Sequence, residues 1–287
     1  MSGQCPGWIV GAALGCLLGP GCKHASPPAQ PLAGNYELVF EDEFDGTALN
    51  PAVWAAECRG CKREGEEQQA YRAGNAVVGG GTLKLVARRE SADGLPFTSA
   101  RVWTKGLKEF TYGRVVARMK LPVGTGFWPA FWLLGNDLEA VGWPRCGEID
   151  IMENAGEPNW TQGAVHGPFG PLGKDKPRDR HFILPTSIAD WHQYRVDWDP
   201  TSVEWYVDDR QVWRIERGEL DPWVFDHPQF LIINLGVGGD APFTYNKTKQ
   251  PYLGVPQATV DLVDAGKGVV EVDWVRVFQR RQPSQDR

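Results

Sequence analysis

Three carboxylates stand close together in one short segment, at Glu148, Asp150 and Glu153, with apolar residues between them. Glu148 and Asp150 are two residues apart, so on a β-strand both side chains lie on the same face. Glu153 is five residues from Glu148, and this odd spacing would turn it toward the core, where a lone carboxylate is costly. A β-bulge, with one extra residue at about Ile151 or Met152, would return Glu153 to the face of the other two.

Three carboxyl groups on one face can carry out acid–base chemistry. Like charges at close range disfavour full ionisation, so at least one pKa rises. A pair with separated pKa values places a protonated acid beside an ionised nucleophile, which a two-carboxylate glycosidase requires. A separation of about 5–5.5 Å favours the retaining route through a covalent glycosyl intermediate. The structural alternatives are a solvated acidic edge strand and a calcium-binding face. The regular interleaving with apolar residues favours catalysis over both.

The elements that must position these carboxylates are short β-strands. Turn residues at 199–202 and 208–211 separate apolar runs, which is typical of an antiparallel meander. In 114–121 the apolar residues fall on one parity and the charged residues on the other, with Val116 as the exception. Strand-like runs occur at 36–40, 83–87, 114–121, 194–198, 203–207, 212–215, 230–235 and 269–278. This pattern predicts an all-β fold, a sandwich or jelly roll, in one domain.

The composition of the chain limits the classes of partner that the protein could bind. The chain has 287 residues, with 30 Lys+Arg against 36 Asp+Glu and a net charge of −6. This mild acidity argues against nucleic acid as a partner. The hydrophobic fraction of 42% is enough for a core. The 13 Trp are explained either by a bulky β core or by stacking platforms for a flat ligand such as a sugar ring.

We expect four segments along the chain. Residues 1–22 hold an apolar run that suits a secretion signal and is too short to span a bilayer comfortably. Residues 23–33 form a Pro-rich linker, 34–280 the catalytic domain and 281–287 a polar tail. The protein is therefore expected to be exported, either extracellular or lipid-anchored at the cell envelope.

The cysteines leave two questions open. Cys22 follows small residues, as in a bacterial lipoprotein cleavage site, so Cys22 or Cys16 is a candidate for a membrane lipid anchor. Beyond the signal the chain keeps Cys58, Cys61 and Cys146, an odd number that excludes a full disulfide framework. Cys58 and Cys61 form either a small disulfide or two free thiols. A zinc site would need two further ligands.

Several other stretches accompany the acidic motif. They are EDEFDG at 41–46, TSAR at 98–101, GFWPAFWLLG at 126–135, VHGP at 165–168, NLGVGG at 234–239 and VDWVRVF at 272–278. With EIDIME at 148–153 they resemble glycoside hydrolase family 16, in its laminarinase-like subgroup with the bulged motif E-x-D-x-x-E. The resemblance implies a jelly-roll β-sandwich with a substrate cleft on its concave face.

The same resemblance implies residue roles. Glu148 would be the nucleophile, Glu153 the general acid/base and Asp150 the assisting carboxylate, in endo-hydrolysis of β-1,3-glucan with retention and without a catalytic cofactor. The predicted substrate-binding residues are Asn75, Arg101, Trp128, Trp132, Trp143, His166 and Asn234. Their structural alternatives are a turn Asn, a surface Arg, core packing for the first two Trp, loop packing for Trp143, a structural His and a buried Asn. A core or sheet-face position is expected for Trp54, Trp198, Trp205 and Trp274.

A structural calcium ion is implied as well. Its ligands would be Glu43 and Gly81 through their backbone carbonyls and Asp273 through its carboxylate, the alternative being an Asp273–Arg salt bridge. The chain departs from the family pattern at 66–71 and at 240–245, which would alter cleft contacts. The expected partner is a β-glucan polysaccharide, bound by a monomer. Two alternatives remain: another β-glycan, such as mixed-linkage glucan, agar or carrageenan, or a non-catalytic glucan-binding module.

Overall fold

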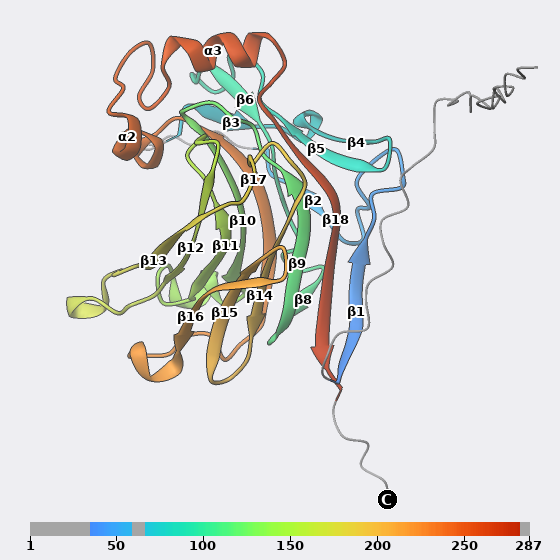
Figure 1. Cartoon of the computed structure of the whole chain (residues 1–287), viewed down its shortest axis with the longest axis vertical. Helices are drawn as coiled ribbons and strands as arrows, with labels where there is room; N and C mark the ends of the chain where they lie inside the picture. Colours follow the sequence, from blue (N-terminus) through green and yellow to red (C-terminus); the bar gives the residue numbers. More distant parts are fainter. Residues whose placement is uncertain (1–34, 59–66, 282–287) are drawn as a thin grey trace, which may run out of the picture. The chain divides into compact units, whose positions relative to one another are not determined.

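The computed structural model describes residues 35–58 and 67–281 (Figure 1). The expected signal at 1–22, the linker at 23–33 and Cys61 lie outside the described residues, as does the tail beyond Arg281. Within the described part, no helix is both long and apolar enough to cross a membrane.

Two eight-stranded sheets dominate the described residues. The first has the order β16-β15-β14-β9-β18-β5-β4, and β1 also pairs with β18. Its strands are β1 (Tyr36–Asp42), β4 (Ala76–Gly79), β5 (Thr82–Val86), β9 (Gly113–Lys120), β14 (His192–Trp198), β15 (Ser202–Val207), β16 (Arg210–Glu216) and β18 (Val269–Arg280). All of its pairings are antiparallel.

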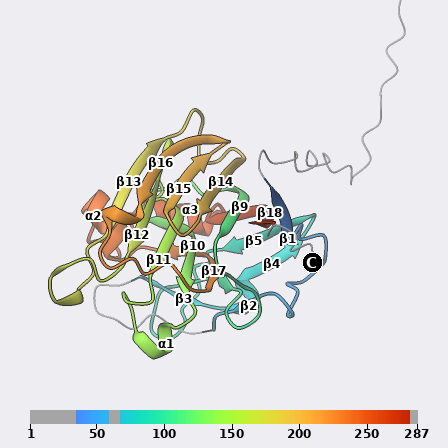
Figure 2. The same cartoon turned by 90° about the horizontal axis from the view of Figure 1, so that it is seen from below.

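The second sheet has the order β13-β12-β11-β10-β17-β7-β2, and β8 also pairs with β17. Its strands are β2 (Ala55–Ala56), β7 (Arg101–Trp103), β8 (Glu109–Phe110), β10 (Phe127–Gly135), β11 (Glu148–Glu153), β12 (Trp160–His166), β13 (Arg178–Ile183) and β17 (Gln229–Val237). Figure 2 looks along the strands and shows the two sheets as stacked, curved layers. The predicted all-β sandwich of jelly-roll type is confirmed.

Smaller elements lie around the sandwich. A parallel pair joins β3 (Gln69–Tyr71) to β6 (Phe97–Ser99). The helices are α1 (Leu138–Val141), α2 (Asp240–Asn246) and α3 (Gln257–Asp264), with short 3-10 turns η1 (Ala73–Asn75), η2 (Pro171–Gly173) and η3 (Arg217–Glu219). Both α2 and α3 lie at the same end of the sheets (Figure 1).

The core lies between the two sheets, as alternation predicts. On β9, Val115, Ala117 and Met119 are fully buried in it. The exception, Val116, is also buried, because it packs with Trp274 and Phe278 in a separate cluster on the outer face of the first sheet. Burial of each large apolar side chain contributes about 1.5–3 kcal/mol, so both faces of β9 stabilise the fold.

The tryptophans expected in the core or on a sheet face are buried. Trp54, Trp198 and Trp205 belong to the central core, and Trp274 covers the outer face of the first sheet. Trp205 fits against Gly163 on the opposite sheet, where a Cβ would lie 2.4 Å from the indole nitrogen. A side chain at position 163 would therefore push the two sheets apart at the site.

Candidate active site

The acidic strand β11 carries the predicted bulge. Against β10, Met152 pairs with Phe131 while Asp150 pairs with Trp132, so Ile151 is the extra residue. Ile151 and Met152 are consecutive, yet both are buried in the core. The bulge absorbs the odd spacing, and Glu153 emerges on the same face as Asp150 and Glu148.

Glu148 is held at the wall of the cleft by Trp143. The Trp143 indole N–H donates to Glu148 Oε2 over 2.9 Å, and Trp143 is 50% exposed. This contact places Trp143 beside Glu148, and its role as a cleft wall stays a prediction. Burial raises the pKa of Glu148, Glu153 raises it further, and the positive charge of His166 opposes the rise.

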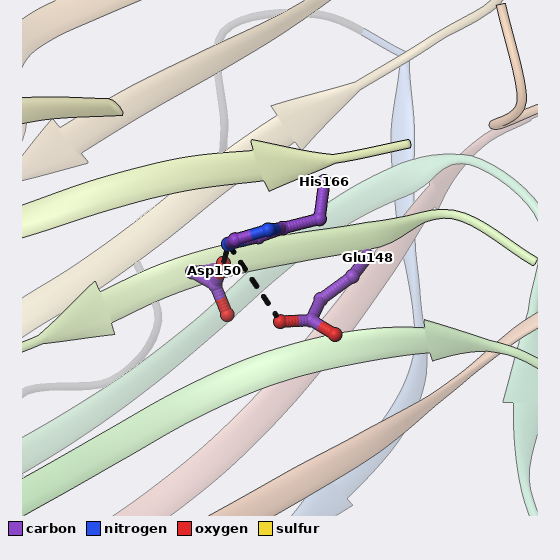
Figure 3. Close-up of side chains that lie close together, drawn as sticks. All are labelled: Glu148, Asp150 and His166. Atoms are coloured by element: carbon purple, nitrogen blue, oxygen red, sulfur yellow. Dashed lines mark ion pairs between the residues drawn. The ribbon is translucent and has the colours of Figure 1, made fainter. Parts of the chain in front are cut away.

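Asp150 is the most deeply buried of the three carboxylates. Burial raises the pKa of Asp150 well above its usual range, and the negative charge of Glu148 adds to the effect. Burial and mutual repulsion therefore disfavour simultaneous ionisation of the two carboxyl groups. Figure 3 shows the two carboxyl groups converging with the imidazole of His166.

Glu153 has two donors, one for each oxygen. The Trp128 indole N–H donates to Oε1 over 2.8 Å, and the Gln162 amide donates to Oε2 over 3.0 Å. Gln162 lies directly opposite Glu153 in the β11–β12 register. The carboxylate is therefore fixed in orientation from both neighbouring strands.

His166 connects the carboxylates to a fourth acid. Its Nε2 lies 3.5 Å from Asp150 Oδ2 and 4.0 Å from Glu148 Oε1, while its Nδ1 lies 2.8 Å from Asp175 Oδ2. Burial disfavours the charged imidazole, yet Glu148 and Asp175 together raise the pKa of His166. The Asp175 carboxylate also accepts a hydrogen bond from the backbone N–H of Gly167, and this bond fixes the position of Asp175. Asp175 was not predicted from the sequence, because it lies in the β12–β13 connection, outside any recognisable motif.

Trp132 and Arg101 extend the same face toward β17 and β7. The Trp132 indole donates to Asn234 Oδ1 over 2.8 Å. Arg101 pairs with Glu57 at 3.3 Å and lies 4.5 Å above the Tyr71 ring. In the divergent segment after Glu66, Glu67 accepts from Gln69 and Tyr71 and lies 3.7 Å from Arg101. The altered segment thus holds Arg101 at the cleft face.

Two of the predicted substrate-binding residues are buried and hydrogen-bonded within the protein. Asn75 is 1% exposed, and its amide donates to the Val86 carbonyl and to Thr98 Oγ1, so it supports the fold as a turn Asn. Asn234 is 3% exposed, and its side-chain oxygen is occupied by the Trp132 indole. Asn234 therefore positions Trp132, and its contact with a sugar hydroxyl stays a prediction.

One group of side chains in the described part of the chain has ligand atoms close enough together for a metal ion. Glu148, Asp150 and His166 each bring one such atom within 4.8 Å of the others, but these are the groups of the acidic site itself. The predicted calcium positions meet elsewhere, along β18. There Asp273 lies between the part of β18 that pairs with β5 and the part that pairs with β1.

The register also brings the other two predicted calcium ligands to this junction. Gly81 directly precedes β5, and Glu43 directly follows β1. The Asp273 carboxylate is 2.6 Å from Arg118, and that of Glu43 is 2.8 Å from Arg276. The Asp273–Arg salt bridge that was the alternative to calcium is therefore present, and the calcium ion stays a prediction.

The cysteines in the described part are Cys58, which is exposed, and Cys146, which is buried as a free thiol. Burial raises the pKa of Cys146 to about 11, with Glu148 adding to the rise. It is therefore a protonated, apolar neighbour of the site. Cys61 lies outside the described residues, so the structure does not choose between a Cys58–Cys61 disulfide and two free thiols.

A jelly-roll sandwich with two glutamates on one face of a strand fits the class of two-carboxylate glycosidases. The model of the glycosyl hydrolases family 16 matches residues 65–253. The chain belongs to this family and is a glycoside hydrolase.

Known relatives agree with this assignment. The chain is 39% identical over 234 residues to a beta-glucanase of Rhodothermus marinus, covering 76% of this chain and 82% of that one. It is 38% identical over 230 residues to a glucan endo-1,3-beta-glucosidase of Cryptopygus antarcticus, covering 72% and 82%. The structure of the laminarinase from Rhodothermus marinus superimposes with a TM-score of 0.74 at 36% identity, covering 88% of this chain and all of that one.

Proposed function

We propose that the protein is a retaining endo-glycosidase that hydrolyses internal β-1,3-glucosidic bonds of laminarin-like β-glucans. The observation that carries the proposal is the bulge at Ile151, which sets Glu153 on the same face as Glu148 and Asp150. The similarity to a glucan endo-1,3-beta-glucosidase and to a laminarinase supports the substrate class. The three carboxylates argue against a module that only binds glucan.

In the proposed first step, Glu148 attacks the anomeric carbon while Glu153 gives its proton to the departing glycosidic oxygen. The bond between the anomeric carbon and that oxygen breaks, and a bond to Glu148 forms. Asp150, which keeps its proton, donates a hydrogen bond to Glu148 and reduces the repulsion between the two carboxylates. Trp143 supplies a second donor to the nucleophile.

In the second step, Glu153 removes a proton from water, and the hydroxide displaces Glu148 from the anomeric carbon. Two inversions leave the product in its original β configuration. Trp128 and Gln162 hold the two oxygens of Glu153, so the same carboxylate acts as acid and then as base without turning.

The substrate is tested by incubating the protein with laminarin, lichenan, curdlan and agarose and determining the linkages of the products. We expect β-1,3-linked oligosaccharides from laminarin. Strong release from agarose without any β-1,3 oligomers would contradict the substrate and favour another β-glycan. For the mechanism, Glu148→Ala should lose activity, and azide should restore it with formation of an inverted glycosyl azide. Unchanged turnover in this variant would refute the assignment of the nucleophile.

We propose that the protein is exported and acts as a monomer, with Cys22 or Cys16 as the site of a lipid anchor if it stays at the envelope. The apolar run in residues 1–22 supports export. Expression of the full chain, followed by N-terminal sequencing and labelling with a fatty-acid probe, distinguishes cleavage from lipidation. The variants Cys22→Ala and Cys16→Ala identify the modified residue, and light scattering of the purified protein gives its mass.

A further inference from the structure

Three aromatic side chains form a cluster beyond Glu153. Trp160 at the start of β12 stacks on His181 of β13, with ring centres 4.4 Å apart and planes inclined by 13°. Tyr245 of α2 lies 5.3 Å from Trp160 and is 42% exposed. An aromatic cluster that only filled the core would be buried, whereas this one borders solvent. We call Trp160, His181 and Tyr245 the aromatic cluster.

Trp160 and Tyr245 of the aromatic cluster line a cavity that includes the acid/base, and His181 supports Trp160 by stacking on it. The cavity has a volume of about 370 Å³, within the range of small-ligand sites. Its lining includes Trp128, Glu153, Trp160, Gln162 and Tyr245. The lining begins at His166, which lies 4.0 Å from Glu148, and most of its other residues lie beyond Glu153 on β12, β13 and α2. The cavity therefore extends from the acidic site past Glu153, and Glu148 is not part of its lining.

Hydrogen bonds connect the cluster to the acid/base. The Tyr245 hydroxyl donates to Gln162 Oε1 over 3.0 Å, and Gln162 Nε2 donates to Glu153 Oε2 over 3.0 Å. The other partner of the Tyr245 hydroxyl is His181 Nε2 at 3.3 Å, which donates in the tautomer protonated at Nε2. Donors therefore follow one direction from His181 through Tyr245 and Gln162 to Glu153.

The position of the cavity tells which part of a glycan would enter it. Glu153 gives its proton to the departing oxygen, so the sugar attached to that oxygen lies beside Glu153. The sugar attacked by Glu148 lies on the other side of the broken bond. Flat aromatic faces are suitable partners for the apolar faces of sugar rings. Tyr245 comes from the segment 240–245, where this chain departs from its family's pattern.

We propose that Trp160, His181 and Tyr245 form the subsite that binds the first sugar unit on the leaving-group side, and that Tyr245 acts through Gln162 as a positioning residue for Glu153. This inference rests on the proposed function and deepens it. The ligand is a β-linked glucosyl unit, stacked on Trp160 and in contact with Tyr245. Tyr245 of α2 thus contributes to the choice of the leaving sugar.

The test compares substrates that differ only in what occupies the leaving-group side. Laminarin fills this subsite with glucosyl units, whereas 4-nitrophenyl β-laminaribioside carries a small leaving group that departs without strong acid assistance. We expect Trp160→Ala to lower kcat/KM on laminarin by roughly tenfold, with less than about a twofold change on the nitrophenyl substrate. Trp160→Phe keeps an aromatic ring and should retain more of the laminarin activity, which covers the case in which the alanine variant does not fold.

The positioning role needs a different readout. Tyr245→Phe removes one hydroxyl, so kcat/KM should fall on phenyl β-laminaribioside, whose poor leaving group needs a proton, and not on the nitrophenyl analogue. Equal losses on both aryl substrates would contradict positioning. Trp191→Ala is the control, because Trp191 is a partly exposed Trp between Arg118 and Lys120 and outside the cleft.

The outcomes separate the two proposals. If the wild-type protein does not cleave laminarin, the proposed function fails, and the same comparison is made with the glycan that it does cleave and the aryl glycosides of that glycan's disaccharide. If Trp160→Ala loses activity equally on polymeric and aryl substrates, or on neither, the subsite is refuted and the proposed function stands.

Discussion

Trp205 on one sheet donates its indole N–H to the backbone carbonyl of Asp150 on the other, over 2.8 Å. Asp150 lies next to the bulge at Ile151, which aims Glu153. The bond reaches across the core only because Gly163 leaves room for the indole. The inner side of the sandwich therefore supports the geometry of a site on its outer surface.

Trp205→Phe is expected to destabilise the protein and to impair the site. The substitution leaves the Asp150 carbonyl buried without its donor, which costs about 1–3 kcal/mol. The melting temperature should fall by several degrees, and kcat should fall because the strand at the bulge is no longer fixed. Thermal denaturation and initial rates on laminarin measure the two effects.

A matched control separates stability from geometry. Trp198 is equally buried and donates its indole N–H to the Phe225 carbonyl over 3.1 Å, away from the bulge. Trp198→Phe should therefore lower the melting temperature by a similar amount and leave kcat near the wild-type value. If both variants lose kcat equally, Trp205 acts only through global stability.

Much of the site could be predicted because it follows local rules. The parity of Glu148, Asp150 and Glu153 along one strand already required a bulge, and β11 contains it. The spacing of Trp128 and Trp132 likewise placed both on one face of β10. These inferences use only the two-residue period of a strand.

Other features depend on contacts that are distant in the sequence. Asn75 donates a hydrogen bond to Thr98, which is 23 residues away in the sequence, and Asn234 accepts one from Trp132, which is 102 residues away. A single sequence does not indicate which distant polar group forms a hydrogen bond with a given Asn side chain. Val116 broke the alternation because the outer face of its sheet has its own apolar cluster. Asp175 lies in the β12–β13 connection and Tyr245 in the short helix α2. The alternation of side chains along a strand does not predict the position of either residue.

Asp150→Asn tests the raised pKa of Asp150 through stability. A carboxyl group whose folded-state pKa is raised contributes stability that is complete at low pH and is lost as the pH rises through the folded-state pKa. Melting temperatures of the wild type should therefore decline from about pH 4 upward for this reason. Asn carries no such proton, so the difference between variant and wild type should move in favour of the variant as the pH rises.

The same variant should be poorly active, because the amide replaces the acid proton beside Glu148. A parallel pH dependence of the two melting temperatures would show that the environment of Asp150 does not raise its pKa. Above neutral pH, Asp150→Asn is predicted to be less active than the wild type while gaining stability relative to it. General misfolding would lower both activity and stability, so the two measurements distinguish it from the loss of the Asp150 proton.

Removal of calcium is expected to lower the melting temperature without abolishing catalysis. The proposed ion lies where β1 and β5 meet β18, at Asp273, and not at the acidic strand. Scans in EDTA and in excess calcium measure the difference, and Asp273→Asn should reduce it. Equal melting temperatures in the two buffers would mean that the Arg118–Asp273 salt bridge stabilises this junction without a metal ion.

Asp175→Asn should lower the pKa of His166 and reduce turnover. Asp175 raises that pKa through its charge and its bond to Nδ1, so its neutral amide weakens the imidazolium. Loss of a charged hydrogen bond of about 1.5–3 kcal/mol corresponds to roughly a 10–100-fold effect if it is fully expressed in kcat. NMR titration of the imidazole gives the pKa, and rates on laminarin give kcat.

The chain offers a matched control in a second His–Asp pair. Asp208 lies 2.6 Å from Nδ1 of His192 and raises the pKa of that imidazole outside the site. Asp208→Asn should lower the pKa of His192 and leave kcat near the wild-type value. If Asp175→Asn lowers the pKa of His166 without changing kcat, then His166 does not need its charge for the reaction. If kcat falls while the pKa stays constant, Asp175 acts by orienting the ring.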